Sequence, residues 1–213
     1  MLLDLLFPPV CLGCGLLLRA QAPAALPLCA WCTPEHLPLP PEAIERDGIT
    51  AVHAYGGPLL RALGRLKFHR QPAWAGPLGA VLSGSDSFGA APWDAIVPVP
   101  LHPSRLRARG YNQATLLARH ARLRLPGGRP PLRPGWLSRV RATPPQHRLA
   151  AAERRTNLQG AFNCLRPRRV AGRRILLVDD VTTTGATLSA ARAALRAAGA
   201  LQVGALALLR TVA

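Results

Sequence analysis

The chain has 213 residues, 49% of them hydrophobic, which is enough for one domain of ordinary size with a small appendage. Its formal charge is +17, and most of the surplus lies in residues 101–213, which hold twenty-one of the 27 basic residues but only three of the ten acidic ones. Without a long apolar run or the basic start of a signal peptide, we expect a cytoplasmic protein with no membrane insertion, whose basic half attracts pyrophosphate groups or nucleic acid.

Four cysteines near the N-terminus form two C-x-x-C pairs. Cys11 and Cys14 make the first pair, and Cys29 and Cys32 make the second. Each such turn aims two sulfurs at one point, so two turns complete a tetrahedron of the kind that binds Zn²⁺. We predict a structural zinc ribbon, because a segment this short cannot build a core alone. The alternative is that the four thiols are free.

Prolines follow the second cysteine pair. Residues 34–42 hold four prolines in nine positions, a composition typical of an extended spacer. We therefore predict a boundary between a zinc ribbon with its linker at 1–44 and a main domain at 45–213.

The first half of the main domain alternates apolar segments of strand and helix type. In chain order we expect a strand at 50–55, helices at 59–68 and 74–83, a loop at 84–92, and a strand at 94–101. Pro98 and Pro100 must end that last strand, because proline cannot donate to a sheet. Lys67 would either complement the dipole of the first helix or contact a pyrophosphate.

An arginine-rich segment comes next. Arg105, Arg107 and Arg109 alternate in an expected loop before a helix at about 112–124, which Asn112 can cap. A guanidinium grips two oxygens at once, so this pattern suits a pyrophosphate or a nucleic-acid backbone; a solvated loop is the alternative. Residues 136–162 show no clear period, with a possible helix at 149–157.

The most informative stretch is 175–187, I-L-L-V-D-D-V-T-T-T-G-A-T. Four apolar residues predict a buried parallel strand, followed by Asp179 and Asp180, a loop of small hydroxyl residues and an alanine-rich helix at 186–198. A last strand at 203–209 would complete a right-handed βαβ unit. The helix start suits a phosphate, whereas the acids would repel one and are better suited to a diol or to Mg²⁺. Together they describe a site for a sugar phosphate.

This stretch resembles the phosphoribosyl pyrophosphate (PRPP) motif of type I phosphoribosyltransferases. The resemblance implies that Asp179 and Asp180 bind the ribose hydroxyls. It implies that the 5′-phosphate is bound by the loop after them: Thr182, Thr183, Thr184, Gly185, Ala186 and Thr187. A Walker-B-like or response-regulator acid is the alternative, but the chain has no P-loop sequence.

The same resemblance implies two further parts of a PRPP site. Backbone N–H groups of a pyrophosphate loop would come from Pro98, Val99, Pro100 and Leu101, with Lys67 beside them. A mobile lid would exclude water and would include Arg139, Arg141, Gln146 and Arg154.

Taken together, the cysteine pairs, the segment V-P-V-P-L-H-P-x-R-L-R-x-R-G-Y-N-Q-A at 97–114 and the PRPP motif resemble the ComF family (competence protein ComF/ComFC). The resemblance implies an α/β fold, with a type I phosphoribosyltransferase-like parallel sheet and flanking helices behind a small N-terminal zinc ribbon. It implies structural Zn²⁺, Mg²⁺ with PRPP, and a role in natural transformation. Single-stranded DNA and DNA-uptake or helicase proteins would be the partners.

If the protein is an enzyme, PRPP would lose pyrophosphate through an oxocarbenium-like state. Asp179 and Asp180 would favour the cation, and Arg107 and Arg109 would neutralise the leaving group. The sequence indicates no acceptor, so three hypotheses stay open: a PRPP-binding protein of DNA uptake, a metabolic phosphoribosyltransferase acting on a base or amine, and a PRPP-sensing regulator without turnover.

Overall fold

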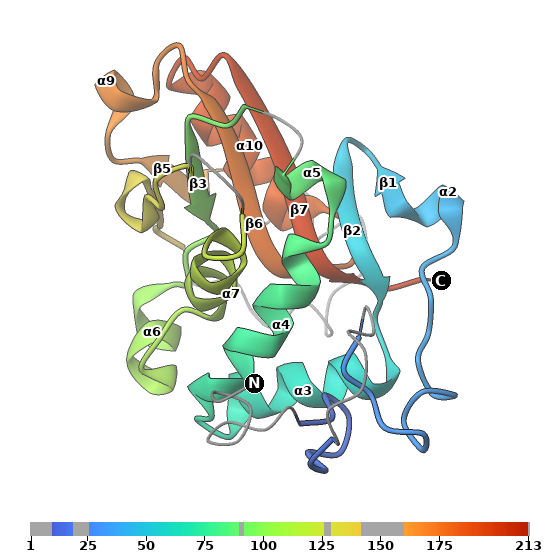
Figure 1. Cartoon of the computed structure of the whole chain (residues 1–213). Helices are drawn as coiled ribbons and strands as arrows, with labels where there is room; N and C mark the ends of the chain where they lie inside the picture. Colours follow the sequence, from blue (N-terminus) through green and yellow to red (C-terminus); the bar gives the residue numbers. More distant parts are fainter. Residues whose placement is uncertain (1–9, 19–25, 90–91, 126–128, 142–159, 213) are drawn as a thin grey trace.

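The computed structural model of the chain is built around a five-stranded sheet (Figure 1). Its strands lie in the order β1-β2-β7-β6-β3, namely β1 (Glu45–Arg46), β2 (Ile49–Ala54), β7 (Gln202–Arg210), β6 (Arg174–Thr182) and β3 (Ala95–Pro98). All neighbours pair in parallel except β1, which is antiparallel to β2. The structure describes residues 10–18, 26–89, 92–125, 129–141 and 160–212.

Helices cover both faces of this sheet (Figure 1). One face packs against α3 (Gly57–Phe68), α4 (Ala75–Ser83) and α7 (Gln113–Arg122), and the other packs against α10 (Ala186–Ala197). Side chains alternate along β6 accordingly: Leu176 and Val178 face the first group, whereas Ile175 and Leu177 face α10. The α/β class with a mostly parallel sheet and flanking helices is therefore confirmed.

The remaining described elements are short. They are α2 (Pro41–Ile44), α5 (Asp86–Gly89), α6 (Pro103–Arg109), α9 (Pro167–Val170), the 3₁₀ turns Pro72–Trp74 and Pro134–Trp136, and an antiparallel pair of β4 (Leu137–Arg139) with β5 (Phe162–Cys164). Three expectations were wrong here. The loop at 84–92 contains α5, the arginine-rich loop is the helix α6, and the aperiodic stretch at 136–162 contains β4 and the start of β5.

The sequence carries signals for α6 that its charged composition obscures. Pro103 occupies the first turn, and the His102 side chain accepts a hydrogen bond from the Ser104 N–H. Gly110, with φ 87°, ends the helix in the left-handed conformation that glycine adopts without strain. Because α6 is a helix, Arg105 and Arg109 share one face, and Arg107 points elsewhere.

At the carboxyl end of the sheet, two neighbouring strands end at different heights. β3 ends at Pro98, and the Val99 N–H donates to the Val178 carbonyl at 2.8 Å. β6 continues beside β7 to Thr182, four residues beyond Val178, so the acidic pair lies inside the strand and not after it as expected. A crevice opens there because β6 has lost its β3 neighbour.

Asn112 fixes the chain at this edge in two ways. Its side-chain oxygen accepts the Ala114 N–H at 3.0 Å, which confirms the predicted cap of α7. Its side-chain amide also donates to the Val99 carbonyl at 2.9 Å, so one residue anchors both the helix start and the segment after β3.

The cysteine segment lies against the main sheet domain through α3. Leu12 is fully buried in the same core cluster as α3 and α4, and Arg61 of α3 donates to the Gly13 carbonyl at 3.3 Å. The boundary between 1–44 and 45–213 stays a prediction. The helix expected at 149–157 and the lid residues Gln146 and Arg154 lie outside the described residues. Among the helices described, none is both long and apolar enough to cross a membrane.

Candidate functional site

A cavity of about 610 Å³ lies at the carboxyl end of β3 and β6. Its walls come from α3, α6, α7, β4, the segment after β3 and the start of α10. It is lined by Lys67, Phe68, Val99, Pro100, Leu101, Arg105, Ala108, Arg109, Gln113, Arg139, Asp179 and Thr187. The sheet edge that the sequence marked as a ligand site therefore borders a cavity.

The acidic pair is almost fully buried, with Asp179 8% and Asp180 4% exposed. The Asp180 N–H donates to Oδ1 of Asp179 at 2.8 Å, and Lys67 Nζ lies 2.6 Å from Oδ2 of Asp180. Burial, and then the charge of Asp180, raise the pKa of Asp179 well above its ordinary value. The site thus keeps one carboxylate paired with a lysine beside one that resists ionisation.

Lys67 reaches this site from the last turn of α3, and the structure adds a role that neither sequence interpretation included. Its side chain is 18% exposed and bridges to an acid 113 positions away in the chain. Because the ammonium neutralises Asp180, it lets two adjacent buried acids coexist.

We expect Lys67→Met to destabilise the fold by roughly 3 kcal/mol at neutral pH, because it leaves Asp180 as an uncompensated buried charge. Adding Asp180→Asn should recover most of that loss. Urea unfolding of both single variants and the double variant measures the coupling. Arg119→Met, which removes the same charge from an exposed position on α7, is the matched control and should cost well under 1 kcal/mol. Additive effects of the two site substitutions would contradict the pairing.

Three arginines line the cavity, and they are not quite the ones expected. Arg109 is half-buried, donates to the Gln113 side chain and lies 5.6 Å from the Phe68 ring centre. Burial lowers its pKa, which the Asp180 charge opposes. Arg105 lies one turn before it on α6, whereas Arg107 is exposed and is not among the lining residues. The four-residue spacing between Arg105 and Arg109 could have identified Arg105 as a lining residue. Residues at that spacing share one face only in a helix, however, and a loop was expected here.

Arg139 also lines the cavity, but its setting differs from that of a mobile lid. It is the last residue of β4, is 8% exposed, and lies 5.5 Å from the ring centre of Phe162 on the paired strand. Burial and then the nearby Arg105 charge lower its pKa. Arg139 is therefore part of the cavity wall in this structure, and its role in a mobile lid stays a prediction. Arg141 is exposed and stands outside the lining.

The segment after β3 lines the cavity, although not with the backbone donors expected of it. Pro98 and Pro100 have no N–H, and the Val99 N–H is already bonded to Val178. Among Pro98, Val99, Pro100 and Leu101, only the Leu101 N–H is therefore left as a candidate donor to an anion. Positive side chains, and not a row of N–H groups, supply most of the attraction for an anion here.

The loop between β6 and α10 has the features of a phosphate-binding loop. The hydroxyl oxygens of Thr182 and Thr184 are buried without a hydrogen-bond partner. Gly185, with φ 76°, turns the chain into α10, whose first N–H groups have no partner within the helix. Thr183 is half-buried, Ala186 begins α10 and Thr187 lines the cavity. Orphaned hydroxyls beside a helix start fit an oxyanion.

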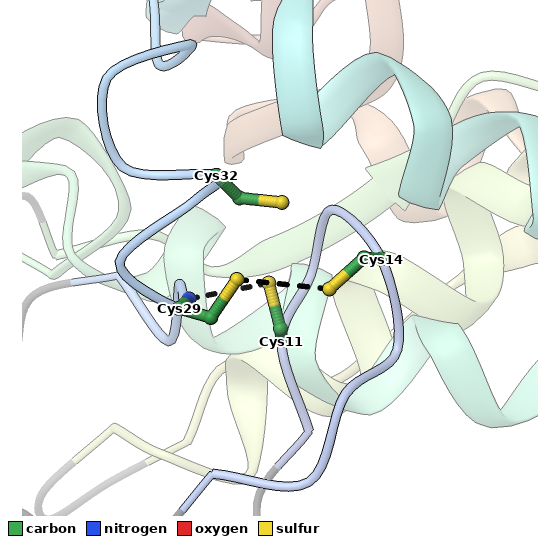
Figure 2. Close-up of side chains that lie close together, drawn as sticks. All are labelled: Cys11, Cys14, Cys29 and Cys32. Atoms are coloured by element: carbon green, nitrogen blue, oxygen red, sulfur yellow. Dashed lines mark hydrogen bonds between the residues drawn. The ribbon is translucent and has the colours of Figure 1, made fainter.

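The four N-terminal cysteines converge in the structure (Figure 2). Their sulfurs all lie within 4.8 Å of one another, and Cys14 Sγ lies 3.7 Å from Cys29 Sγ. Four sulfurs about 2.3 Å from a tetrahedral zinc ion are about 3.8 Å apart, so the cluster fits Zn²⁺. The four cysteines predicted from the sequence therefore lie together as a candidate structural zinc site.

The surroundings of this cluster favour an anionic sulfur at Cys11 but not at Cys32, where burial and then hydrogen bonds with the other three thiols raise the pKa to about 12. The Cys29 N–H donates to Cys11 Sγ at 3.3 Å and Arg61 approaches Cys32 Sγ at 3.6 Å. Burial opposes ionisation of Cys11, but backbone hydrogen bonds from Cys14, Cys29 and Gly13 lower its pKa to about 6. Cys164, 132 positions beyond Cys32, is partly buried against the second core cluster, apart from this site.

Comparisons with known proteins identify the family of the chain. The family model for the phosphoribosyl transferase domain matches residues 140–212. The chain is 35% identical over 178 residues to the DNA utilization protein YhgH of Escherichia coli O157:H7, covering 77% of this chain and 72% of that protein. It is 39% identical over 113 residues to Competence protein F of Haemophilus influenzae, covering 52% of this chain and 47% of that protein.

Among solved structures, the chain matches the glutamine phosphoribosylpyrophosphate amidotransferase of Bacillus subtilis with a TM-score of 0.41 and 20% identity. The match covers 68% of this chain and 30% of that one.

Proposed function

Because this chain belongs to the family of DNA utilization protein YhgH and Competence protein F, the ComF family, we propose that it binds Mg²⁺–PRPP and acts in DNA uptake. The observation that carries the PRPP assignment is the acidic pair near the carboxyl end of β6 beside a hydroxyl-rich helix start, with Asp179 and Thr187 lining one cavity. On a sugar phosphate, the ribose diol matches the acidic pair and the phosphate matches the hydroxyl-rich helix start.

The proposed ligand pose follows the charges of the site. The ribose hydroxyls donate to Asp179 and Asp180, and the 5′-phosphate accepts from Thr182, Thr184 and the first N–H groups of α10. The pyrophosphate then extends toward Arg105 and Arg109, while Lys67 stands between the pyrophosphate and the acids. Arg107 has no place in this pose because it is exposed outside the cavity lining.

Charge complementarity supports this pose. PRPP brings several negative charges, and the cavity offers one lysine and three arginines around the acidic pair. Mg²⁺ bound with PRPP would neutralise part of the pyrophosphate charge. The chain's own residues hold the ribose ring over the acids, where negative charge favours an oxocarbenium-like C1′ if pyrophosphate departs.

The role in DNA uptake rests on the relatives and on the charge of the chain. Both relatives carry names that refer to DNA utilisation or competence. The basic C-terminal half is suited to contact single-stranded DNA during uptake. We place the protein in the cytoplasm, with DNA-uptake or helicase proteins as partners. The zinc ribbon and its linker form an N-terminal unit that packs on α3.

Ligand-dependent thermal unfolding tests the PRPP assignment. At a concentration of one hundred times its Kd, Mg²⁺–PRPP should stabilise the fold by about 2.7 kcal/mol, which is roughly 5–10 °C for a chain of this size. Ribose 5-phosphate and Mg²⁺–pyrophosphate, each carrying one half of the ligand, should shift the Tm less. No shift with Mg²⁺–PRPP, or an equal shift with Mg²⁺–pyrophosphate alone, would overturn the assignment.

A further inference from the structure

A second pocket lies at the opposite end of the sheet from the acidic pair. It has a volume of about 340 Å³ and is lined by Asp94, Pro131, Arg133, Trp136, Arg168, Arg169 and Arg173. Asp94 directly precedes β3 and Arg173 directly precedes β6, so this pocket lies at the amino ends of both strands. Asp179 lies six residues after Arg173, which corresponds to roughly 20 Å of extended strand.

Four of the lining residues are arginines without a structural task in the described part of the chain. Arg133, Arg168, Arg169 and Arg173 are all exposed, and no hydrogen bond or ion pair of their side chains occurs there. Structural arginines in this protein behave differently: Arg192 donates to the Gly48 carbonyl at 2.6 Å, and Arg210 donates to the Ile49 carbonyl at 2.5 Å. The four guanidiniums are therefore available for an external anion.

The one acid that lines this pocket does not neutralise these arginines. Oδ2 of Asp94 accepts the Arg174 backbone N–H at 2.7 Å and lies 3.7 Å from the Arg174 side-chain Nε. Both contacts tie Asp94 to the start of β6. The pocket therefore carries a net positive charge.

A hydrogen-bonded turn carries three of these four arginines. Val170 is fully buried and anchors α9, which lies at the same end of the molecule as the amino end of β3 in Figure 1. The Gly172 N–H donates to the Gly199 carbonyl at 2.8 Å, and the Arg173 N–H donates to the Val170 carbonyl at 3.1 Å. The backbone that carries Arg168, Arg169 and Arg173 is thus fixed at both ends.

Trp136 adds an aromatic surface to the charged pocket. Its ring is partly buried against the second core cluster, and its backbone is held by hydrogen bonds to Arg133 and Leu165. Arginines that hold phosphates, combined with an aromatic ring on which a base can stack, are the typical equipment of proteins that bind single-stranded nucleic acid. Duplex DNA keeps its bases stacked inside, so it could use only the arginines.

We propose that this pocket, lined by Trp136 and the four arginines, binds single-stranded DNA, with phosphates on the arginines and a base against the Trp136 ring. This inference rests on the proposed role in DNA uptake and places the DNA at the end of the sheet opposite the PRPP cavity. Because the two sites lie at opposite ends of β6, both ligands can be bound at once.

The first test compares two variants with equal loss of charge. Arg168→Gln with Arg169→Gln should weaken binding of a labelled oligothymidylate about tenfold and reduce the slope of log K against log salt by about 1.4. Arg46→Gln with Arg119→Gln removes two exposed arginines elsewhere and should change affinity less than threefold. Mg²⁺–PRPP binding should be unchanged in both. If the two double variants weaken DNA binding equally, the pocket is not the DNA site, although the chain would still be a DNA-binding protein.

The second test addresses the stacked base and needs no variant. An abasic oligonucleotide of the same length should bind the unmodified chain at least about fivefold more weakly than oligothymidylate. Equal affinity for the abasic strand, or tighter binding of duplex DNA, would overturn the single-strand assignment. If the unmodified chain binds no DNA while it still binds Mg²⁺–PRPP, both this inference and the proposed direct contact with DNA fail, and the PRPP assignment survives.

Discussion

Replacing Asp179 and Asp180 together by asparagine should weaken Mg²⁺–PRPP binding more than a hundredfold and leave the fold intact. The ribose loses Asp180 as a charged acceptor and Asp179 as a carboxyl acceptor; a hydrogen bond to a charged group contributes about 1.5–3 kcal/mol and one between neutral groups about 0.5–1.5 kcal/mol. Asparagine is nearly the same size, and its oxygen at position 179 can still accept the Asp180 backbone N–H bond. Calorimetric titration measures the affinity, and circular dichroism monitors the fold.

Two exposed acids outside the site provide the matched control. Asp47→Asn with Asp86→Asn removes the same charge, and Asp47 has φ 55°, a conformation that asparagine tolerates well. This control should bind Mg²⁺–PRPP as the unmodified chain does. An unchanged affinity in the Asp179/Asp180 variant would contradict the placement of the ribose.

The single variant Asp179→Asn should separate ligand binding from stability. Burial raises the pKa of Asp179 in the folded state, so the folded chain holds this proton more tightly than the unfolded chain does. The associated stability is complete below the unfolded pKa and is lost as pH rises through the folded pKa. The variant should therefore be more stable than the parent at pH 8, with a smaller difference at low pH. Equal or lower stability at pH 8 in urea unfolding would contradict the stated cause.

The second large effect is expected from the zinc site. Purified protein should contain one Zn²⁺ per chain, and its removal or Cys29→Ser should unfold the cysteine segment. Structural zinc contributes about 10–16 kcal/mol in small zinc modules, which matches or exceeds the whole stability of an ordinary domain. Because Leu12 is buried with α3 and α4, the loss should also lower the Tm of the sheet domain.

Cys164→Ser is the control for the zinc prediction. Cys164 lies in β5 and contacts the second core cluster, so its substitution should leave the metal content at one per chain. Metal analysis by mass spectrometry measures this directly. Protein without zinc, with the four N-terminal thiols paired as disulfides, would contradict the assignment.

The sequence predicted the features that are encoded locally. The apolar run at 175–178, the hydroxyl loop and the alanine-rich segment after it are contiguous, so they identified β6, α10 and the loop between them. The short C-x-x-C spacing likewise brought Cys11 and Cys14 together, and it brought Cys29 and Cys32 together. Asn112 was recognised as a cap because capping acts over two residues.

Features that depend on distant residues escaped prediction. Lys67 meets Asp180, and Asn112 meets the Val99 carbonyl, only after the sheet and helices have assembled. Arg139 looked like part of an irregular basic stretch because its strand is three residues long and pairs only with a distant partner, β5. The pocket at Trp136 likewise joins the segments before β3, before β4 and before β6, which no local pattern connects.

The most direct measurement is a calorimetric titration of Mg²⁺–PRPP into the zinc-loaded full chain, alone and with a saturating single-stranded oligonucleotide. Saturable binding of one PRPP per chain is the predicted result, and it should persist with DNA present because the proposed sites lie at opposite ends of β6. Any change in affinity between the two titrations gives the coupling free energy of the two ligands. Absence of saturable PRPP binding, in protein with normal zinc content and normal Tm, would contradict the account.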